Sequence, residues 1–231
     1  SVYGPSRVVM ERDFSRFGVR SDFVDTSDVD AVREAMTPQT RIVFVETPAN
    51  PTIVLSDIAA VAAIAHDHGA LLVVDNTFAS PILQRPLELG ADLVMHSMTK
   101  FINGHTDVVA GIIDASSDEL LARIKPVHSY LGACMDPHQA WLVYRGLKTL
   151  ALRVEKAQDN ARELSDLLHQ HPALVQHEEV GDALDAVAGG DLRDLLSCAR
   201  SLGTEEATVK VRVQVKGDHS GITLRPVRGH E

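Results

Sequence analysis

The stretch "SDIAAVAAIAHDHGALLVVDN", which runs from Ser56 to Asn76, contains both kinds of element that decide the fold. Its first part is rich in alanine and aliphatic residues, with Ser56 as a candidate N-cap and Gly69 beyond the last turn, so we expect a helix there. From Leu71 the residues are apolar almost without interruption. Such a run is typical of a strand buried on both faces, as in a parallel sheet covered by helices.

The same alternation of elements continues on either side of this stretch. Residues 28–36 have a helical pattern, and residues 41–46 and 92–97 have the pattern of short strands. Together they predict an α/β fold with an open, mostly parallel sheet flanked by helices. Ligands bind such sheets at the carboxyl ends of the strands. Three polar residues stand at those ends and are expected to converge on one crevice: Glu46, Asp75 and Ser97.

The pattern changes in the second half of the chain. A short helix is expected near residues 116–124, and Asp136 followed by Pro137 is a start signal for a long amphipathic helix. We therefore predict an α/β domain over residues 1–135, a long linking helix over residues 136–171, and a shortened C-terminal α+β domain over residues 172–231.

The composition favours a protein that handles small molecules. The chain has 231 residues, 23% of them charged, with a net charge of −10 and no basic runs, which excludes an electrostatic footprint for nucleic acid or an acidic membrane. No apolar run approaches the roughly 20 residues that cross a bilayer. Two cysteines, Cys134 and Cys198, are too few for a disulfide framework, so we expect ordinary buried thiols and a cytoplasmic protein.

Four residues near the predicted strand ends supply the groups that a single cofactor needs. A pyridoxal phosphate enzyme requires a lysine amine for the cofactor aldehyde, a carboxylate beside the ring nitrogen, and hydroxyl donors for the phosphate. Lys100 supplies the amine, and Asp75 supplies a carboxylate at a buried strand end, where a low dielectric strengthens its attraction for a protonated ring. Ser97 and Thr99 are the candidate phosphate ligands.

Each of these residues also has a simpler interpretation when it is taken alone. Asp75 could form an Asx-turn, Ser97 and Thr99 could cap the strand end, and Lys100 could be a solvated surface charge. The combination favours the cofactor, since no dinucleotide, P-loop, zinc-protease or nucleophile-elbow motif occurs in the sequence. No metal site is expected at the "HDH" stretch, because side chains two positions apart on a helix point away from one another.

Three stretches give the pattern a likeness to a known family: "VETPANP" from Val45, "HSMTKFINGHTDVVAGII" from His96 and "RGLKTLALR" from Arg145. They resemble the Cys/Met metabolism family of pyridoxal phosphate enzymes, which includes cystathionine γ-synthase, cystathionine γ-lyase, methionine γ-lyase and the acylhomoserine sulfhydrylases. The likeness extends from about Val2 to His171. It implies the transferase fold of the aspartate aminotransferase type for the pyridoxal phosphate-binding domain.

The resemblance adds two residues to the site. By this likeness Lys100 would bond to the cofactor and move protons, while Asp75, Ser97 and Thr99 would keep the roles given above. The opening "VYGPSR" implies that Tyr3 stacks on the cofactor ring and acts near the leaving group, which makes it a second catalytic residue. Asn50 in "PANP" would contact the cofactor hydroxyl.

Two C-terminal stretches resemble the part of the family that binds substrate. "ARSLGTEEATV" from Ala199 nominates Ser201, and "ITLRPVRGHE" from Ile222 nominates Arg225 as a clamp for the substrate carboxylate. The family's N-terminal segment, which carries a glycine-containing phosphate loop and residues that reach the neighbouring subunit, has no counterpart in the sequence. The chain is therefore expected to be a truncated representative.

The function implied by the resemblance is γ-elimination or γ-replacement on sulfur amino acids or acylhomoserines, in a homo-oligomer, a dimer or tetramer. Pro5 stands where methionine γ-lyases typically carry a cysteine, so strict methionine specificity is not implied. An alternative from another class is a catalytically impaired remnant that binds pyridoxal phosphate, or pairs with a full-length relative, without turnover. A non-enzymatic α/β scaffold without a cofactor is a third interpretation.

Overall fold

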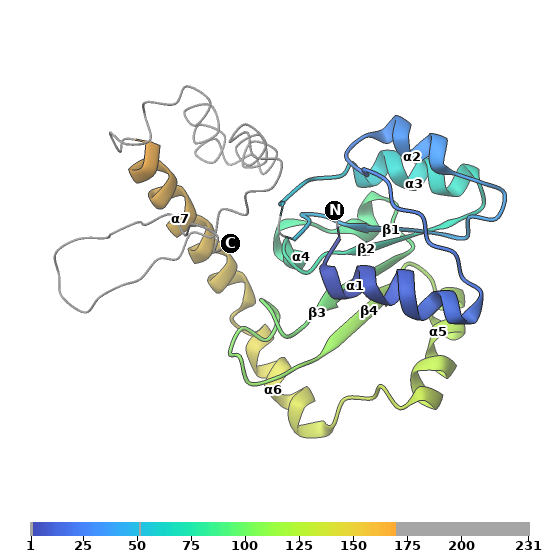
Figure 1. Cartoon of the computed structure of the whole chain (residues 1–231). Helices are drawn as coiled ribbons and strands as arrows, with labels where there is room; N and C mark the ends of the chain where they lie inside the picture. Colours follow the sequence, from blue (N-terminus) through green and yellow to red (C-terminus); the bar gives the residue numbers. More distant parts are fainter. Residues whose placement is uncertain (1, 51, 170–231) are drawn as a thin grey trace, which may run out of the picture.

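A four-stranded sheet forms the centre of the molecule. The structure is a computed structural model that describes residues 2–50 and 52–169. The strands are β1 (Ile42–Glu46), β2 (Leu71–Asp75), β3 (Leu93–Ser97) and β4 (Gly111–Ala115), in that order across the sheet (Figure 1). The first three strands are parallel and β4 is antiparallel to β3. The mostly parallel α/β sheet predicted from the sequence is thus confirmed.

The two helices that precede β1 and β2 in the chain begin at aspartate caps. The carboxylate of Asp28 accepts hydrogen bonds from two amides at the start of α2 (Val29–Ala35), and that of Asp57 accepts one from Ala60 at the start of α3 (Ile58–Asp67). Such bonds satisfy amides that have no partner inside the helix. The predicted cap Ser56 instead pairs its hydroxyl with that of Thr26, at 2.7 Å. The expectation of a Ser56 cap was wrong by one residue.

The main core lies between the sheet and α3. Leu72 and Val74 of β2 are fully buried, whereas Leu71 and Val73, which point to the other face, are only half-buried. The sequence predicted burial on both faces, and the described residues cover only one of them completely. The buried members of this core are Val32, Val43, Val45, Ile58, Val61, Ala62, Ile64, Ala65, Ala70, Leu72, Val74, Ala91 and Val94.

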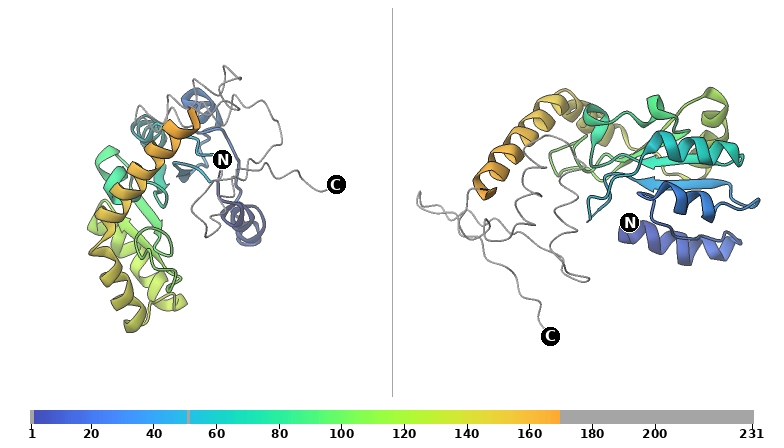
Figure 2. Two further views of the ribbon diagram at one scale, coloured as in Figure 1. Left: turned by 90° about the vertical axis from the view of Figure 1, so that its left-hand side faces the viewer. Right: turned by 90° about the horizontal axis from the view of Figure 1, so that it is seen from above.

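The predicted linking helix is two helices in the structure. Asp136 caps α6 (Pro137–Leu147), as expected, but the helix ends there and α7 (Leu150–His169) follows after Lys148 and Thr149. The break lies where the chain packs against the turn after β3, in a second core. Its buried members are Met98, Ile102, Val108, Val143, Leu150 and Val154. Beyond this contact α7 leads away from the sheet (Figures 1 and 2).

The remaining helices are mostly short. They are α1 (Gly4–Val8), a π-helical turn (Val9–Asp13), two 3₁₀ turns (Phe14–Phe17 and Pro86–Leu89), α4 (Ser80–Leu83) and α5 (Asp118–Leu131). α5 is longer than predicted and none of its residues is buried. Cys134, expected to be buried, is exposed, because it follows this uncovered helix. Cys198 and the predicted C-terminal domain lie outside the described residues. No helix within residues 2–50 and 52–169 has the length and hydropathy of a membrane span.

Candidate functional site

The carboxyl ends of the parallel strands bring the predicted polar residues together. Glu46 of β1 is the register partner of Asp75 of β2, which is in turn the partner of Met95 of β3. Because strand side chains alternate between faces, Ser97, two residues after Met95, points to the same face as these partners. Glu46, Asp75 and Ser97 are therefore aligned at one edge and on one face of the sheet, as predicted, while the predicted crevice around them stays a prediction.

Asp75 has one occupied and one available carboxylate oxygen. Its side chain is buried, with 8% of the residue exposed. Oδ1 accepts hydrogen bonds from the backbone amide of Thr77, at 3.0 Å, and from the Thr77 hydroxyl, at 2.5 Å. No hydrogen bond from the described residues reaches the other oxygen. The Asx-turn considered from sequence does form, and it leaves Oδ2 free for a second donor.

Lys100 lies in the turn that follows β3. Its backbone amide donates to the carbonyl of Ser97, at 3.1 Å, and its carbonyl accepts from the amide of Gly104, at 2.8 Å. These bonds fix the backbone while the side chain is exposed. Within residues 2–50 and 52–169, no carboxylate forms an ion pair with the Lys100 amine. The amine is therefore unengaged.

The two candidate phosphate ligands differ in their present bonding. The Ser97 hydroxyl has no hydrogen-bond partner among the described residues, so it can donate to a ligand. The Thr99 hydroxyl accepts from the amide of Ala110, at 3.0 Å, and donates to its carbonyl over a long 3.4 Å. Thr99 thus joins the end of β3 to the start of β4, and it would have to turn its hydrogen away from Ala110 to bind a phosphate.

Arg153 of α7 forms hydrogen bonds with the backbone of the turn that carries Lys100. Its guanidinium donates to the carbonyls of Phe101 (2.5 Å), Ile102 (3.4 Å) and Gly146 (2.8 Å). Burial of the guanidinium lowers the pKa of Arg153 from its usual value. Gly104, at φ +72°, leaves room for this side chain, because a Cβ there would overlap the guanidinium. Arg153 lies in the quoted "RGLKTLALR" stretch, but its contact with this turn was not predicted.

Glu46 connects Tyr3 and Asn50 to the end of β1. Its two carboxylate oxygens accept the backbone amides of Tyr3, at 2.5 Å, and of Asn50, at 2.8 Å. Burial raises the pKa of Glu46, as does the nearby charge of Asp75, while the two amide hydrogen bonds lower it. The Tyr3 residue remains 47% exposed. Glu46 was expected in the crevice, but its bonds to these two segments could not be read from the sequence.

The predicted substrate residues Ser201 and Arg225 lie outside the described residues. The part of the chain that the structure describes contains no group of three or more histidine, cysteine or carboxylate side chains arranged to hold a metal ion. His66 and His68, considered as metal ligands, have separate partners: the carboxylate of Asp92 and the carbonyl of Ile64.

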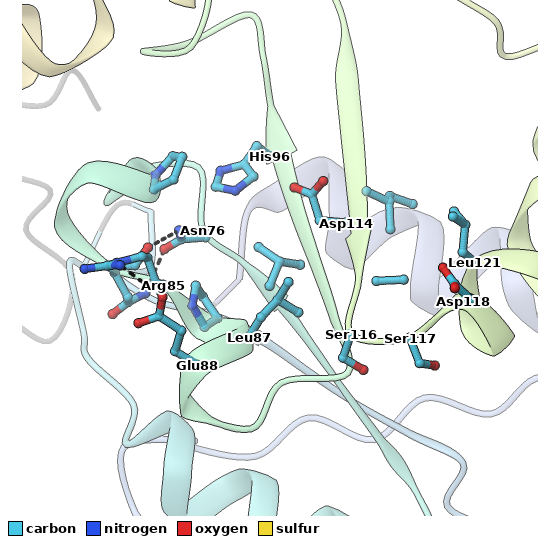
Figure 3. A pocket seen from close by; sticks show the side chains of 16 residues that line it. Asn76, Arg85, Leu87, Glu88, His96, Asp114, Ser116, Ser117, Asp118 and Leu121 are labelled. Carbon is cyan, nitrogen blue, oxygen red and sulfur yellow. Dashed lines mark hydrogen bonds and ion pairs between the residues drawn. The ribbon is translucent and has the colours of Figure 1, made fainter.

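A cavity of about 730 Å³ lies on the opposite face of the sheet, beside the start of α5 (Figure 3). Val94 and His96 line it, and they alternate with the site-facing Met95 and Ser97. His96 is only 4% exposed, and its Nδ1 atom has no hydrogen-bond partner among residues 2–50 and 52–169. Burial lowers the pKa of His96, against the opposing effects of Asp114, Asp75 and the Asn76 carbonyl. This cavity is separate from the strand-end site.

Three residues of the strand-end site fit separate parts of pyridoxal phosphate. A free oxygen on the buried Asp75 suits the hydrogen of a protonated ring nitrogen, and the free Ser97 hydroxyl suits a phosphate oxygen. The exposed Lys100 amine is available to an aldehyde. These residues come from β2, β3 and the turn after β3, and they lie at one end of the sheet.

Comparison with known proteins gives consistent matches. The family described as "Cys/Met metabolism PLP-dependent enzyme" matches residues 1–180. The cystathionine gamma-lyase of Dictyostelium discoideum is 47% identical over 173 residues, which cover 75% of this chain and 45% of that protein. The cystathionine gamma-synthase/O-acetylhomoserine (thiol)-lyase of Bacillus subtilis is 42% identical over 191 residues, which cover 83% of this chain and 50% of that protein.

A solved structure supports the same likeness. The cystathionine gamma-lyase from Lactobacillus plantarum, complexed with L-serine, superposes with a TM-score of 0.73 at 40% identity, covering 74% of this chain and 45% of that one. The chain therefore spans about half the length of the proteins it matches.

Proposed function

Since this chain belongs to the family of Cys/Met metabolism pyridoxal phosphate-dependent enzymes, we propose that it acts in γ-elimination or γ-replacement on sulfur amino acids or acylhomoserines. The observation that carries the proposal is the set at the strand ends: a buried carboxylate with a free oxygen, a free hydroxyl and an unengaged lysine amine. The relatives named above are lyases and synthases of this chemistry, and their names support the reaction class.

Different residues of this chain would bind the ring and the phosphate of the cofactor. When bound, pyridoxal phosphate supplies a conjugated ring that takes up the electrons released at the substrate Cα. The free Oδ2 of Asp75 would accept the hydrogen of the ring nitrogen, and burial strengthens that interaction. Ser97 and Thr99 would donate to the phosphate, and Asn50 would contact the ring hydroxyl.

Proton movement would belong to Lys100 and Tyr3. The Lys100 amine would remove the proton from the substrate Cα and then move a proton off Cβ. The electron pair of that Cβ–H bond would form a Cβ–Cγ double bond, while the bond from Cγ to its sulfur or oxygen substituent breaks and the substituent leaves with the electron pair of that bond. Tyr3, whose backbone is held by Glu46, would lie near the leaving group and protonate it. A lyase would then consume one water and release a 2-oxo acid and ammonia, whereas a synthase would capture a thiol at Cγ.

The test of this proposal is the position at which the cofactor attaches. The purified chain is titrated with pyridoxal phosphate, its visible absorbance is recorded, and borohydride reduction is followed by peptide mass mapping. We expect a yellow complex with the label on Lys100, lost in Lys100→Ala and kept in Lys125→Ala, a variant on the exposed face of α5. Label spread over surface lysines, or unchanged absorbance in Lys100→Ala, would contradict the assignment.

A second measurement separates the reaction types. The loaded chain is incubated with methionine, cystathionine or an acylhomoserine, with and without an added thiol, and both 2-oxo acid and thioether products are quantified. In Lys100→Ala we expect turnover to fall by roughly 10²–10⁴-fold, the usual contribution of a positioned acid–base group.

A second candidate function is pairing with a full-length relative without turnover. Four of the five residues of β4 are exposed, and α5 buries none of its residues, so the described part of the chain leaves both elements uncovered. Sedimentation of the chain alone, and mixed with a full-length relative, tests this candidate. A homo-oligomer that turns over substrate supports the enzyme, while an inactive chain that associates only with the relative supports the second candidate.

A further inference from the structure

The ladder between β2 and β3 ends in an unusual way at the site. The register pairs Asp75 with Met95, and the amide of Asn76 still donates to the carbonyl of Met95, at 2.9 Å. The next β3 amide on this side belongs to Ser97, and it donates to the hydroxyl of Thr77, at 2.8 Å. A side-chain oxygen therefore takes the place of the backbone carbonyl that would continue the ladder.

The same hydroxyl donates to the carboxylate of Asp75. The Thr77 Oγ1 atom lies 2.5 Å from Oδ1 of Asp75, and a hydroxyl has one hydrogen to donate and lone pairs to accept with. Since the Ser97 amide can only donate, the direction of the two bonds is set: from Ser97 to Thr77, and from Thr77 to Asp75. The Thr77 amide, which also donates to Oδ1, fixes the rotation of the carboxylate. Oδ2 is thereby left free.

These bonds join the two ends of the proposed cofactor site through one atom. Asp75 would hold the ring nitrogen, and Ser97 begins the segment that carries Thr99 and Lys100. We propose that Thr77 is a positioning residue for pyridoxal phosphate, which sets where the Asp75 carboxylate stands relative to the Ser97 strand end. This inference rests on the proposed function and adds a residue that contacts the site residues themselves.

The test removes the hydroxyl and keeps the shape. Thr77→Val replaces the hydroxyl by a methyl, Thr77→Ser keeps the hydroxyl, and Thr40→Val is the matched control. The Thr40 hydroxyl likewise accepts a backbone amide, that of Thr37 at 3.0 Å, but it precedes the amino end of β1. Three quantities are measured in each full-length variant: hydrogen exchange of the Ser97 amide, the dissociation constant for pyridoxal phosphate, and the share of borohydride-trapped label on Lys100.

We expect Thr77→Val to weaken pyridoxal phosphate binding by about tenfold or more, the scale of a lost hydrogen bond to a charged group. The Ser97 amide should exchange faster in this variant, and the label should spread from Lys100 to other lysines. Thr77→Ser should restore all three readouts, and Thr40→Val should match the unmodified chain. If Thr77→Val does not fold, Thr77→Ser is compared with Thr77→Ala, since these two differ only by the hydroxyl.

Two results would overturn the inference and they differ from one another. In the first, a folded Thr77→Val binds pyridoxal phosphate as tightly as the unmodified chain, although its Ser97 amide exchanges faster. The hydrogen bonds from Ser97 to Thr77 and from Thr77 to Asp75 would then be purely structural. An unmodified chain that binds no pyridoxal phosphate would end the proposed function and, with it, the positioning role, whatever the exchange of the Ser97 amide shows.

Discussion

Gly146 of α6 lies directly against the backbone of Asn103, in the turn that carries Lys100. A Cβ at position 146 would overlap the carbonyl oxygen of Asn103, and no flexible side chain is available to move aside. Asn103 is itself fully buried and donates to the carboxylate of Asp107, at 2.7 Å. The helix and the lysine-bearing turn are thus packed backbone to backbone, which couples the second core to the candidate site.

Gly146→Ala is expected to lower the free energy of unfolding by about 1–3 kcal/mol, the usual effect of overpacking a close contact. The backbone of Asn103 would have to shift, so the share of borohydride label on Lys100 should also fall. Urea denaturation measures the first effect. Gly111→Ala is the control, because a Cβ there meets its nearest neighbour at an ordinary 3.7 Å. Equal stability of the two variants would contradict the packing described here.

Arg153→Lys should loosen the lysine-bearing turn although the charge is kept. A lysine ammonium cannot reproduce the planar fork that reaches the carbonyls of Phe101 and Gly146. We expect a loss of about 1–3 kcal/mol in the free energy of unfolding, because these carbonyls lose hydrogen bonds from a charged donor. Arg162→Lys is the control, since Arg162 forms an exposed pair with Asp159 and should change stability by less than about 0.5 kcal/mol. Similar losses in both variants would remove the special role of Arg153.

Local signals in the sequence account for most of the fold. Apolar runs located β1, β2 and β3 to within one residue, and Asp28 and Asp136 mark true helix starts. The sequence alone did not show that Asp57 caps α3 in place of the predicted Ser56, because this depends on the Thr26 hydroxyl that pairs with Ser56. The break between α6 and α7 was missed because it depends on contacts with a turn more than forty positions earlier in the chain.

The candidate site, too, could be predicted only in part from the sequence. The residue types at Asp75, Ser97 and Lys100 could be chosen from the sequence, because a cofactor constrains the chemistry at strand ends. The contribution of Thr77 could not, since it depends on the register between β2 and β3. The Asp-x-Thr spacing of an Asx-turn was the only available signal, and many such turns have no function.

The buried His96 is expected to make stability depend on pH near neutrality. Burial lowers its pKa below the ordinary 6.5, so the unfolded chain takes up a proton that the folded chain resists. The resulting stabilisation is present above pH 6.5 and is lost as the pH falls through the folded pKa. The free energy of unfolding should therefore fall more steeply from pH 7.5 to pH 5 in the unmodified chain than in His96→Gln. Parallel curves over that range would contradict a buried, neutral His96, and coincident slopes between about pH 8 and 9 are the internal control.

Glu46 should give the opposite dependence at lower pH. Burial raises its pKa above the ordinary 4.5, so the folded state favours the protonated acid, and this contribution is present below pH 4.5 and lost as the pH rises through the folded pKa. The side chain of Glu46→Gln does not titrate. Its oxygen can accept one of the two backbone amides, of Tyr3 or Asn50, but its NH2 group then faces the other, which lowers the free energy of unfolding by about 1–3 kcal/mol. The difference in unfolding free energy between the two proteins should therefore be larger at pH 4 than at pH 7. Asp75→Asn removes a charge that contributes to the raised pKa of Glu46. In that background, the difference in unfolding free energy that Glu46→Gln makes should therefore change less from pH 4 to pH 7. A difference that stays constant, or that grows toward pH 7, would show that the fold favours the ionised carboxylate, and Glu46 would then hold the Tyr3 and Asn50 segments as a permanent anion.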